Sequence, residues 1–126
     1  YLLLTHRKAL DCRSAALSFP QVMIFMLRPT FLFRPGSESV LVPLNVKAIM
    51  PSDMVLLLFI RSSLAVKSNL SLVNGVGVID SDYANNPDND GNIGVKFRNS
   101  GCENIIIREG ERCIAGHFCT LFCNRR

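Results

Sequence analysis

The chain has 126 residues, of which 48% are hydrophobic, and a formal net charge of +4. The length fits a single domain, and the hydrophobic fraction excludes an intrinsically disordered chain. Between positions 26 and 112 basic and acidic residues balance at nine of each, so the positive excess lies in the two ends. We therefore predict that the domain binds no nucleic acid.

The apolar runs are short. The longest, at 21–27 and 54–60, fall well below the roughly 20 residues that a membrane-spanning helix needs, so we expect no membrane span. In residues 1–10 the apolar residues precede the positive ones, which reverses the order of a secretory signal. Five cysteines without a regular spacing favour a reducing compartment over a disulfide framework. We predict a cytoplasmic protein.

Four residues near the C-terminus could be grouped as metal ligands, namely Cys113, His117, Cys119 and Cys123. Their spacing matches no common zinc pattern, and the chain has no second pair of the kind that zinc ribbons use. We therefore assign no metal-binding residues from the sequence.

From position 31 onward, short runs rich in β-forming residues alternate with turn residues. Strands at this spacing, separated by glycine, proline and asparagine, predict an all-β sandwich or jelly roll. Helix should be minor, with a single turn after Arg61. The expected strands are 31–33, 40–44, 46–50, 54–60, 70–73, 76–79, 93–97 and 105–107.

The strand expected at 54–60 leads directly into Arg61, Ser62 and Ser63. Arginine offers a planar fork of donors to phosphate oxygens, and neighbouring hydroxyl groups complete such a cradle. An isolated Arg-Ser-Ser triplet identifies nothing, so its value depends on the motifs around it.

The next informative stretch, 74–83, reads Asn-Gly-Val-Gly-Val-Ile-Asp-Ser-Asp-Tyr. Its two glycines allow another molecule to approach the backbone closely, while valine and isoleucine favour a strand. A strand that ends in Asp80 and Tyr83 suits the wall of a binding site. Taken alone, the spacing favours an aspartate that caps a turn over a catalytic aspartate, and Tyr83 could be an ordinary core tyrosine.

The run Gly77–Tyr83 resembles the signature of the homotrimeric deoxyuridine triphosphatases (dUTPases), with Arg61–Ala65 upstream and Gly110–Arg112 downstream as further matching elements. Residues 85–91 resemble a loop of one bacterial and phage branch. The resemblance covers residues 26–118. It implies one domain, 1–126, with a distorted jelly-roll fold, a homotrimer with sites between subunits, and hydrolysis of dUTP to dUMP and pyrophosphate. It also implies Mg²⁺ bound through the substrate phosphates.

The resemblance assigns roles to particular side chains. Asp80 would be the general base that activates the water attacking the α-phosphorus, and Asp82 would serve the structure. Tyr83 would pack under the deoxyribose and leave no room for a 2′-hydroxyl. Uracil would be bound by Asn74 and by backbone groups of 75–79, as an added strand would be. The expected site residues are Asp80 as the catalytic residue, and Arg61, Ser62, Ser63, Asn74, Gly77, Ile79 and Tyr83 as substrate-binding residues.

The sequence departs from the family pattern in several places. Ile24 stands where an aspartate should help to hold the magnesium hydration shell, and Ala115 stands where a phosphate-binding glutamine should be. Ile60 replaces the usual proline before Arg61. A Gly-rich C-terminal arm is not found. Losses of positioning contacts of this kind predict weakened catalysis.

Codon degeneracy offers an explanation for these departures. A gene for 21–25, read in a shifted frame, can spell the expected Gly-Tyr-Asp-Phe, and one for 113–118 can spell Gln-Gly-Ile-Phe. We hypothesise that 26–112 is the family-like core, and that 1–25 and 113–126 are translated out of the ancestral frame. The uneven distribution of charge and cysteine agrees with this hypothesis.

Three alternative functions remain open. A dCTP deaminase shares the fold and the arginine-serine element but lacks the Ile-Asp-x-Asp-Tyr signature. A catalytically inactive nucleotide-binding or regulatory protein would bind nucleotide without turnover. A pseudogene-like remnant would fail to form the trimer.

Overall fold

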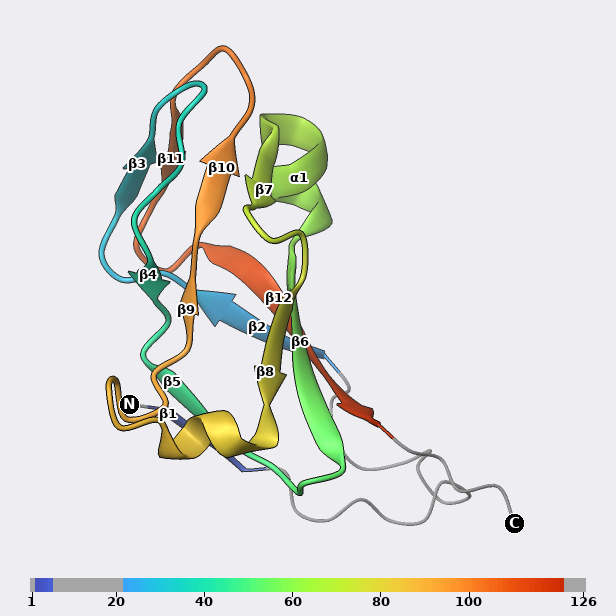
Figure 1. The fold of residues 1–126 in the computed structure, drawn as a ribbon. Coiled ribbons are helices and arrows are strands. Elements are labelled where there is room, and N and C mark those ends of the chain that lie inside the picture. Colours follow the sequence, from blue (N-terminus) through green and yellow to red (C-terminus); the bar gives the residue numbers. More distant parts are fainter. Residues whose placement is uncertain (1, 6–21, 122–126) are drawn as a thin grey trace.

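The computed structural model describes residues 2–5 and 22–121 (Figure 1). Within these ranges the chain is built mainly of strands, together with the helix α1 (Ser62–Ser68) and the 3-10 helix η1 (Ser81–Asn85). The all-β class with little helix is confirmed. The strands are β1 (Leu2–Thr5), β2 (Val22–Met26), β3 (Phe31–Phe33), β4 (Val42–Pro43), β5 (Val46–Ile49), β6 (Met54–Ile60), β7 (Leu70–Leu72), β8 (Gly77–Asp80), β9 (Gly94–Val95), β10 (Phe97–Asn99), β11 (Ile105–Ile107) and β12 (Arg112–Thr120).

Several elements differ from the sequence expectation. The strand expected at 40–44 is reduced to β4, where Pro43 lacks the N–H that a longer ladder would need. The strand expected at 93–97 is divided, because β9 pairs with β4 and β10 pairs with β7. The chain changes partners at Lys96, whose carbonyl accepts the N–H of Val73 at 2.9 Å. Helix α1 is seven residues long, more than the single turn expected, and η1 was not predicted.

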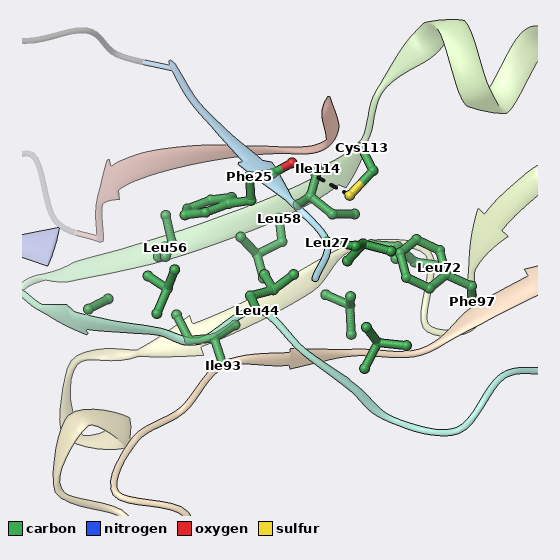
Figure 2. Packing of buried hydrophobic residues seen from close by; sticks show 14 of the residues in the cluster. Phe25, Leu27, Leu44, Leu56, Leu58, Leu72, Ile93, Phe97, Cys113 and Ile114 are labelled. Atoms are coloured by element: carbon green, nitrogen blue, oxygen red, sulfur yellow. Dashed lines mark hydrogen bonds between the residues drawn. The ribbon is translucent and has the colours of Figure 1, made fainter. Parts of the chain in front are cut away.

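The element that carries the site is a four-stranded sheet in the order β2-β12-β6-β8, antiparallel throughout. One face of this sheet packs into the core, where Phe25, Leu56, Leu58 and Ile114 are buried together (Figure 2). Gly116 of β12 faces the same way, and a Cβ there would lie 2.7 Å from the Phe25 ring. The close approach of β12 to this ring therefore requires glycine.

Smaller ladders complete the core on the side opposite the sheet. The pairs β3–β11, β4–β9 and β7–β10 contribute the buried Phe33, Val42 and Phe97. The rings of Phe33 and Phe97 are tilted, with centroids 5.0 Å apart. Asn99 is fully buried beside them, and its side chain donates to the carbonyls of Phe33 (3.0 Å) and Glu103 (2.8 Å). These bonds satisfy the buried amide nitrogen of Asn99 and tie the turn that follows β10 to β3.

The other face of the four-stranded sheet, which we call the outer face, points away from that core. Alternate residues of a strand share a face, and cross-strand partners in register lie side by side on it. Much of the face is apolar and accessible, since Ile24 is 39% and Val78 58% exposed. The ring of His117 meets the ring of Phe59 edge-on, with centroids 5.6 Å apart. The outer face includes Ile24, Val55, Leu57, Phe59, Val78, Asp80, Ala115, His117 and Cys119.

Cys113 lies at a register shift in β12 and is fully buried in the core. Its thiol donates to the carbonyl of Phe25 at 3.5 Å, and burial raises the pKa of the thiol to about 12. Because the thiolate is the reactive form, we expect Cys113 to resist alkylation in the folded protein. The measurement is iodoacetamide labelling of a variant that keeps Cys113 as its only cysteine, with and without denaturant.

The matched control keeps only Cys102, which is exposed. It should be labelled equally with and without denaturant. Labelling of native Cys113 at the rate of Cys102 would show that the thiol is accessible and that β12 is not packed as described.

Candidate active site

Strand β8 forms an open edge of the four-stranded sheet. Among the described strands it pairs with β6 alone, in the register Gly77 opposite Leu58. A Cβ at Gly77 would lie 3.0 Å from the Cβ of Leu58, so the residue type follows from close packing of the two strands. Asn74 is exposed in the preceding turn, and Ile79 is half-buried. The edge of β8 away from β6 pairs with no other described strand, and the binding of uracil there stays a prediction.

Asp80 ends β8 on the outer face. Its backbone is the N-cap of η1 in an extended conformation, yet its side chain makes no capping hydrogen bond, and the residue is exposed. The Asp80 carboxylate therefore does not cap the turn, contrary to the alternative interpretation. An exposed carboxylate at the end of an open strand can accept a proton from a water molecule beside a bound substrate.

Tyr83 follows in η1 and is half-buried against the hydrophobic core. Its hydroxyl group accepts a hydrogen bond from Nδ2 of Asn89 at 2.7 Å and donates to the carbonyl of Asn92 at 3.3 Å. The ring is thus neither a fully buried core tyrosine nor a free surface side chain. The sequence analysis missed Asn89, for which the only signal was the resemblance of the loop 85–91.

Arg61 follows β6 directly and begins α1. Its N–H donates to the carbonyl of Cys113 at 2.9 Å, which ties the end of β6 to the start of β12. Arg61 itself is half-buried, and Ser62 and Ser63 are exposed in the first turn of α1. Ile60, in the place of the usual proline, is paired with Ile114 inside the sheet. These three polar side chains form a group at the end of the sheet.

The two groups of expected site residues lie far apart within one chain. Asp80 is opposite Val55 in β6, whereas Arg61 follows the end of β6, six residues beyond Val55. The backbone of Arg61 is still extended, so its side chain continues the alternation on the outer face. At about 3.3 Å per residue the separation is about 20 Å. Figure 1 shows α1 and η1 at opposite ends of the β6–β8 pair. The structure unites the β8 group with Tyr83, and Arg61 with the serines, but does not bring the two groups together.

The two positions that depart from the family pattern are neighbours. Ala115 of β12 is in register with Ile24 of β2 on one side and with Phe59 of β6 on the other. This row lies two residues from Arg61 along β6, on the same face. The positions at which the family pattern has a phosphate-binding glutamine and a magnesium-holding aspartate thus lie in the same region as Arg61, although they are separated in the sequence.

The described residues contain no group of three His, Cys, Asp or Glu side chains that could hold a metal ion. Of the grouping considered for zinc, Cys123 lies outside the described residues. Cys113 is buried in the core while His117 lies on the outer face, so the two side chains point to opposite sides of the sheet. No helix in the described part of the chain is long and apolar enough to cross a membrane.

The sequence model of the dUTPase family matches residues 25–116. The chain belongs to the dUTPase family. A deoxyuridine 5′-triphosphate nucleotidohydrolase of Lactococcus lactis is 46% identical over 89 residues, which cover 71% of this chain and 59% of that protein. One from Desulfitobacterium hafniense is 44% identical over 64 residues, covering 51% of this chain and 38% of that protein. The match therefore spans less than two thirds of the length of each of these curated relatives.

Solved structures agree with the fold of this dUTPase-family chain. A dUTPase from Streptococcus mutans has a TM-score of 0.75 at 35% identity, covering 88% of this chain and 86% of that one. The dUTPase from phage phi11 of S. aureus has a TM-score of 0.68 at 15% identity, covering 88% of this chain and 83% of that one, and so shows the fold alone. The expectation of a dUTPase-like jelly roll is confirmed.

Proposed function

We propose that the chain hydrolyses dUTP to dUMP and pyrophosphate. The observation that carries the proposal is the end of β8, where an open strand edge leads to an exposed carboxylate that caps nothing and then to a half-buried tyrosine. Membership of the dUTPase family supports it. The same edge suits uracil, which backbone groups from Gly77 to Ile79 and the side chain of Asn74 would bind as they would an added strand.

In the proposed reaction Asp80 accepts a proton from a water molecule as the water oxygen attacks the α-phosphorus. The bond from this phosphorus to the bridging oxygen breaks, and pyrophosphate leaves. Arg61, Ser62 and Ser63 hold the phosphate oxygens, and the guanidinium stabilises the negative charge that develops on them. The ring of Tyr83 packs under the deoxyribose and excludes a 2′-hydroxyl.

The separation between Asp80 and Arg61 requires a second copy of the chain. A triphosphate at one carboxylate cannot be held by a guanidinium about 20 Å away on the same sheet. A neighbouring subunit docked on the outer face would supply the missing group, and the exposed Ile24 and Val78 favour such association. We propose a homotrimer with sites between subunits, in which Asp80 of one subunit works with Arg61 of another.

Magnesium would enter with the substrate phosphates and neutralise part of their charge. The protein fits the ion poorly at one position, because the apolar Ile24 stands on the outer face where a carboxylate should hold the hydration shell. We therefore assign no protein ligand to the ion and derive no step through it. The roles proposed for Asp80 and Arg61 do not depend on a protein ligand to the ion.

The direct test is the release of pyrophosphate from dUTP, measured beside the release of ammonia from dCTP. Pyrophosphate alone supports the proposal, and ammonia would indicate a dCTP deaminase. Binding of dUTP without release of either product would favour a regulatory protein. A protein that neither binds nucleotide nor assembles would be a remnant. A cytoplasmic location remains a prediction.

A further inference from the structure

The hydroxyl group of Tyr83 is held from two sides by one loop. Nδ2 of Asn89 donates to it at 2.7 Å, and it donates to the carbonyl of Asn92 at 3.3 Å. The same Nδ2 also donates to that carbonyl at 3.2 Å, so the three groups form a closed set. Because a ring anchored at its hydroxyl end has little freedom to tilt, this set determines where the ring face lies.

The amide of Asn89 can present only its nitrogen to the tyrosine. Its Oδ1 accepts the N–H of Gly91 at 3.0 Å, which leaves the Nδ2 end to face the Tyr83 hydroxyl group. A side-chain amide offers an acceptor at one end and donors at the other. The backbone of the loop therefore determines the direction of the hydrogen bond that reaches the ring.

The loop that carries Asn89 is itself fixed to the body of the protein. Gly91 has φ of +73°, and a Cβ there would lie 2.8 Å from the backbone of Ala84, so the loop packs directly on η1. Asp90 forms an ion pair with Lys47 of β5 at 2.8 Å. The buried Ile93 donates its N–H to the carbonyl of Val46 at 2.9 Å. Asn89 is thus held by contacts that lie outside the site.

We infer that Asn89 is a positioning residue for sugar selectivity. It orients the Tyr83 ring, whose face decides whether a hydrogen or a hydroxyl at the 2′ carbon is accepted. Rejection of a 2′-hydroxyl requires that the Tyr83 ring stay in a fixed position, because a small shift of the ring would make room for the hydroxyl group. The inference rests on the proposed function and extends it to a residue of the 85–91 loop that acts through Tyr83.

The test is a double-mutant cycle of Asn89→Ala and Tyr83→Phe, with kcat/KM measured for dUTP and for UTP. Each single variant should lower the ratio of the two by roughly three- to tenfold, the range that corresponds to one hydrogen bond. The double variant should lose no more than either single variant, because both changes remove the same contact. Asn86→Ala is the matched control, since Oδ1 of Asn86 accepts the N–H of Asp88 in the same loop.

A spectroscopic measurement reports on the ring without catalysis. The chain has two tyrosines, Tyr1 and Tyr83, and no tryptophan, so in a Tyr1→Phe background the near-ultraviolet tyrosine band of the circular dichroism belongs to Tyr83. Asn89→Ala should weaken this band while the far-ultraviolet spectrum stays unchanged, and Asn86→Ala should preserve both.

The outcomes separate the inference from the proposed function. A parent chain that releases no pyrophosphate from dUTP contradicts the proposed function alone, and selectivity is then measured as relative binding of dUMP and UMP by calorimetry. Asn89→Ala with the selectivity and the tyrosine band of Asn86→Ala would overturn the inference. So would losses from Asn89→Ala and Tyr83→Phe that add in full.

Discussion

Replacement of Asp80 by asparagine is expected to lower the rate of pyrophosphate release from dUTP by about 10²- to 10⁴-fold, the contribution usual for a general base. Asparagine has nearly the same shape but cannot accept the proton of the attacking water. Because the Asp80 side chain is exposed and caps nothing, the substitution should leave the fold and the binding of nucleotide intact. The measurement is kcat for dUTP, with the affinity for dUMP determined separately.

The matched control for this prediction is Asp82→Asn. Asp82 lies two residues away, is also exposed, and sits in the first turn of η1. It should keep kcat within a small factor of the parent. An equal loss of kcat in both variants would show that the negative charge of the turn matters, and not a general base at position 80. An unchanged kcat in Asp80→Asn would show that Asp80 is not the general base.

The second large effect is a gain. The combined variant Ile24→Asp and Ala115→Gln is expected to raise kcat/KM for dUTP by about 10²-fold, because each change restores one positioning contact of the family pattern. The two positions are in register on the outer face, and Ile24 is 39% exposed on the edge strand β2, so a carboxylate fits there without burial. The measurement compares the combined variant with the parent chain.

Met26→Asp combined with Ala115→Gln is the control for position. Met26 lies two residues along β2, is 44% exposed, and is in register with Arg112, away from Ala115. The control should bring less of the gain. A gain of equal size from both carboxylates would reveal a general effect of negative charge, and no gain from either would exclude Ile24 as the altered position.

The extent of the family match bears on the hypothesis that both ends of the chain are translated out of frame. The family match spans 25–116, so it begins one residue before and ends four residues after the core expected at 26–112. In β12 it includes the buried Cys113 and Ile114. The division of the chain at these boundaries remains a prediction. An independent read of the gene across both regions would show whether Gly-Tyr-Asp-Phe and Gln-Gly-Ile-Phe stand there in the ancestral frame.

The sequence was most informative where local pattern and pairing agree. The uniform apolar run at 54–60 became β6, and the valine- and isoleucine-rich run expected at 76–79 became the edge strand β8. What the sequence did not show depends on contacts between distant residues. The switch of partners at Lys96 follows from the positions of β4 and β7, and the bond from Asn89 to Tyr83 follows from packing of the loop on Ala84.

The separation of the site residues has the same cause. The family resemblance predicts that Arg61 and Asp80 act in the same site. Only the register of β6 with β8 shows that they lie at opposite ends of this strand pair. The separation of about 20 Å between Asp80 and Arg61 is therefore the reason for proposing a site shared between subunits. If the two groups act on one substrate, as proposed, they must come from two copies of the chain.

The most direct test of this account is to mix two variants, Arg61→Ala and Asp80→Asn, each made in whichever of the parent or the restored chain turns over dUTP faster. Alone, each variant should be nearly inactive. After unfolding and refolding together in equal amounts, a trimer with shared sites should recover about a quarter of the unmutated rate, because about one site in four then combines an intact Asp80 with an intact Arg61. Mixed oligomers seen by native mass spectrometry without recovered activity would contradict the shared site.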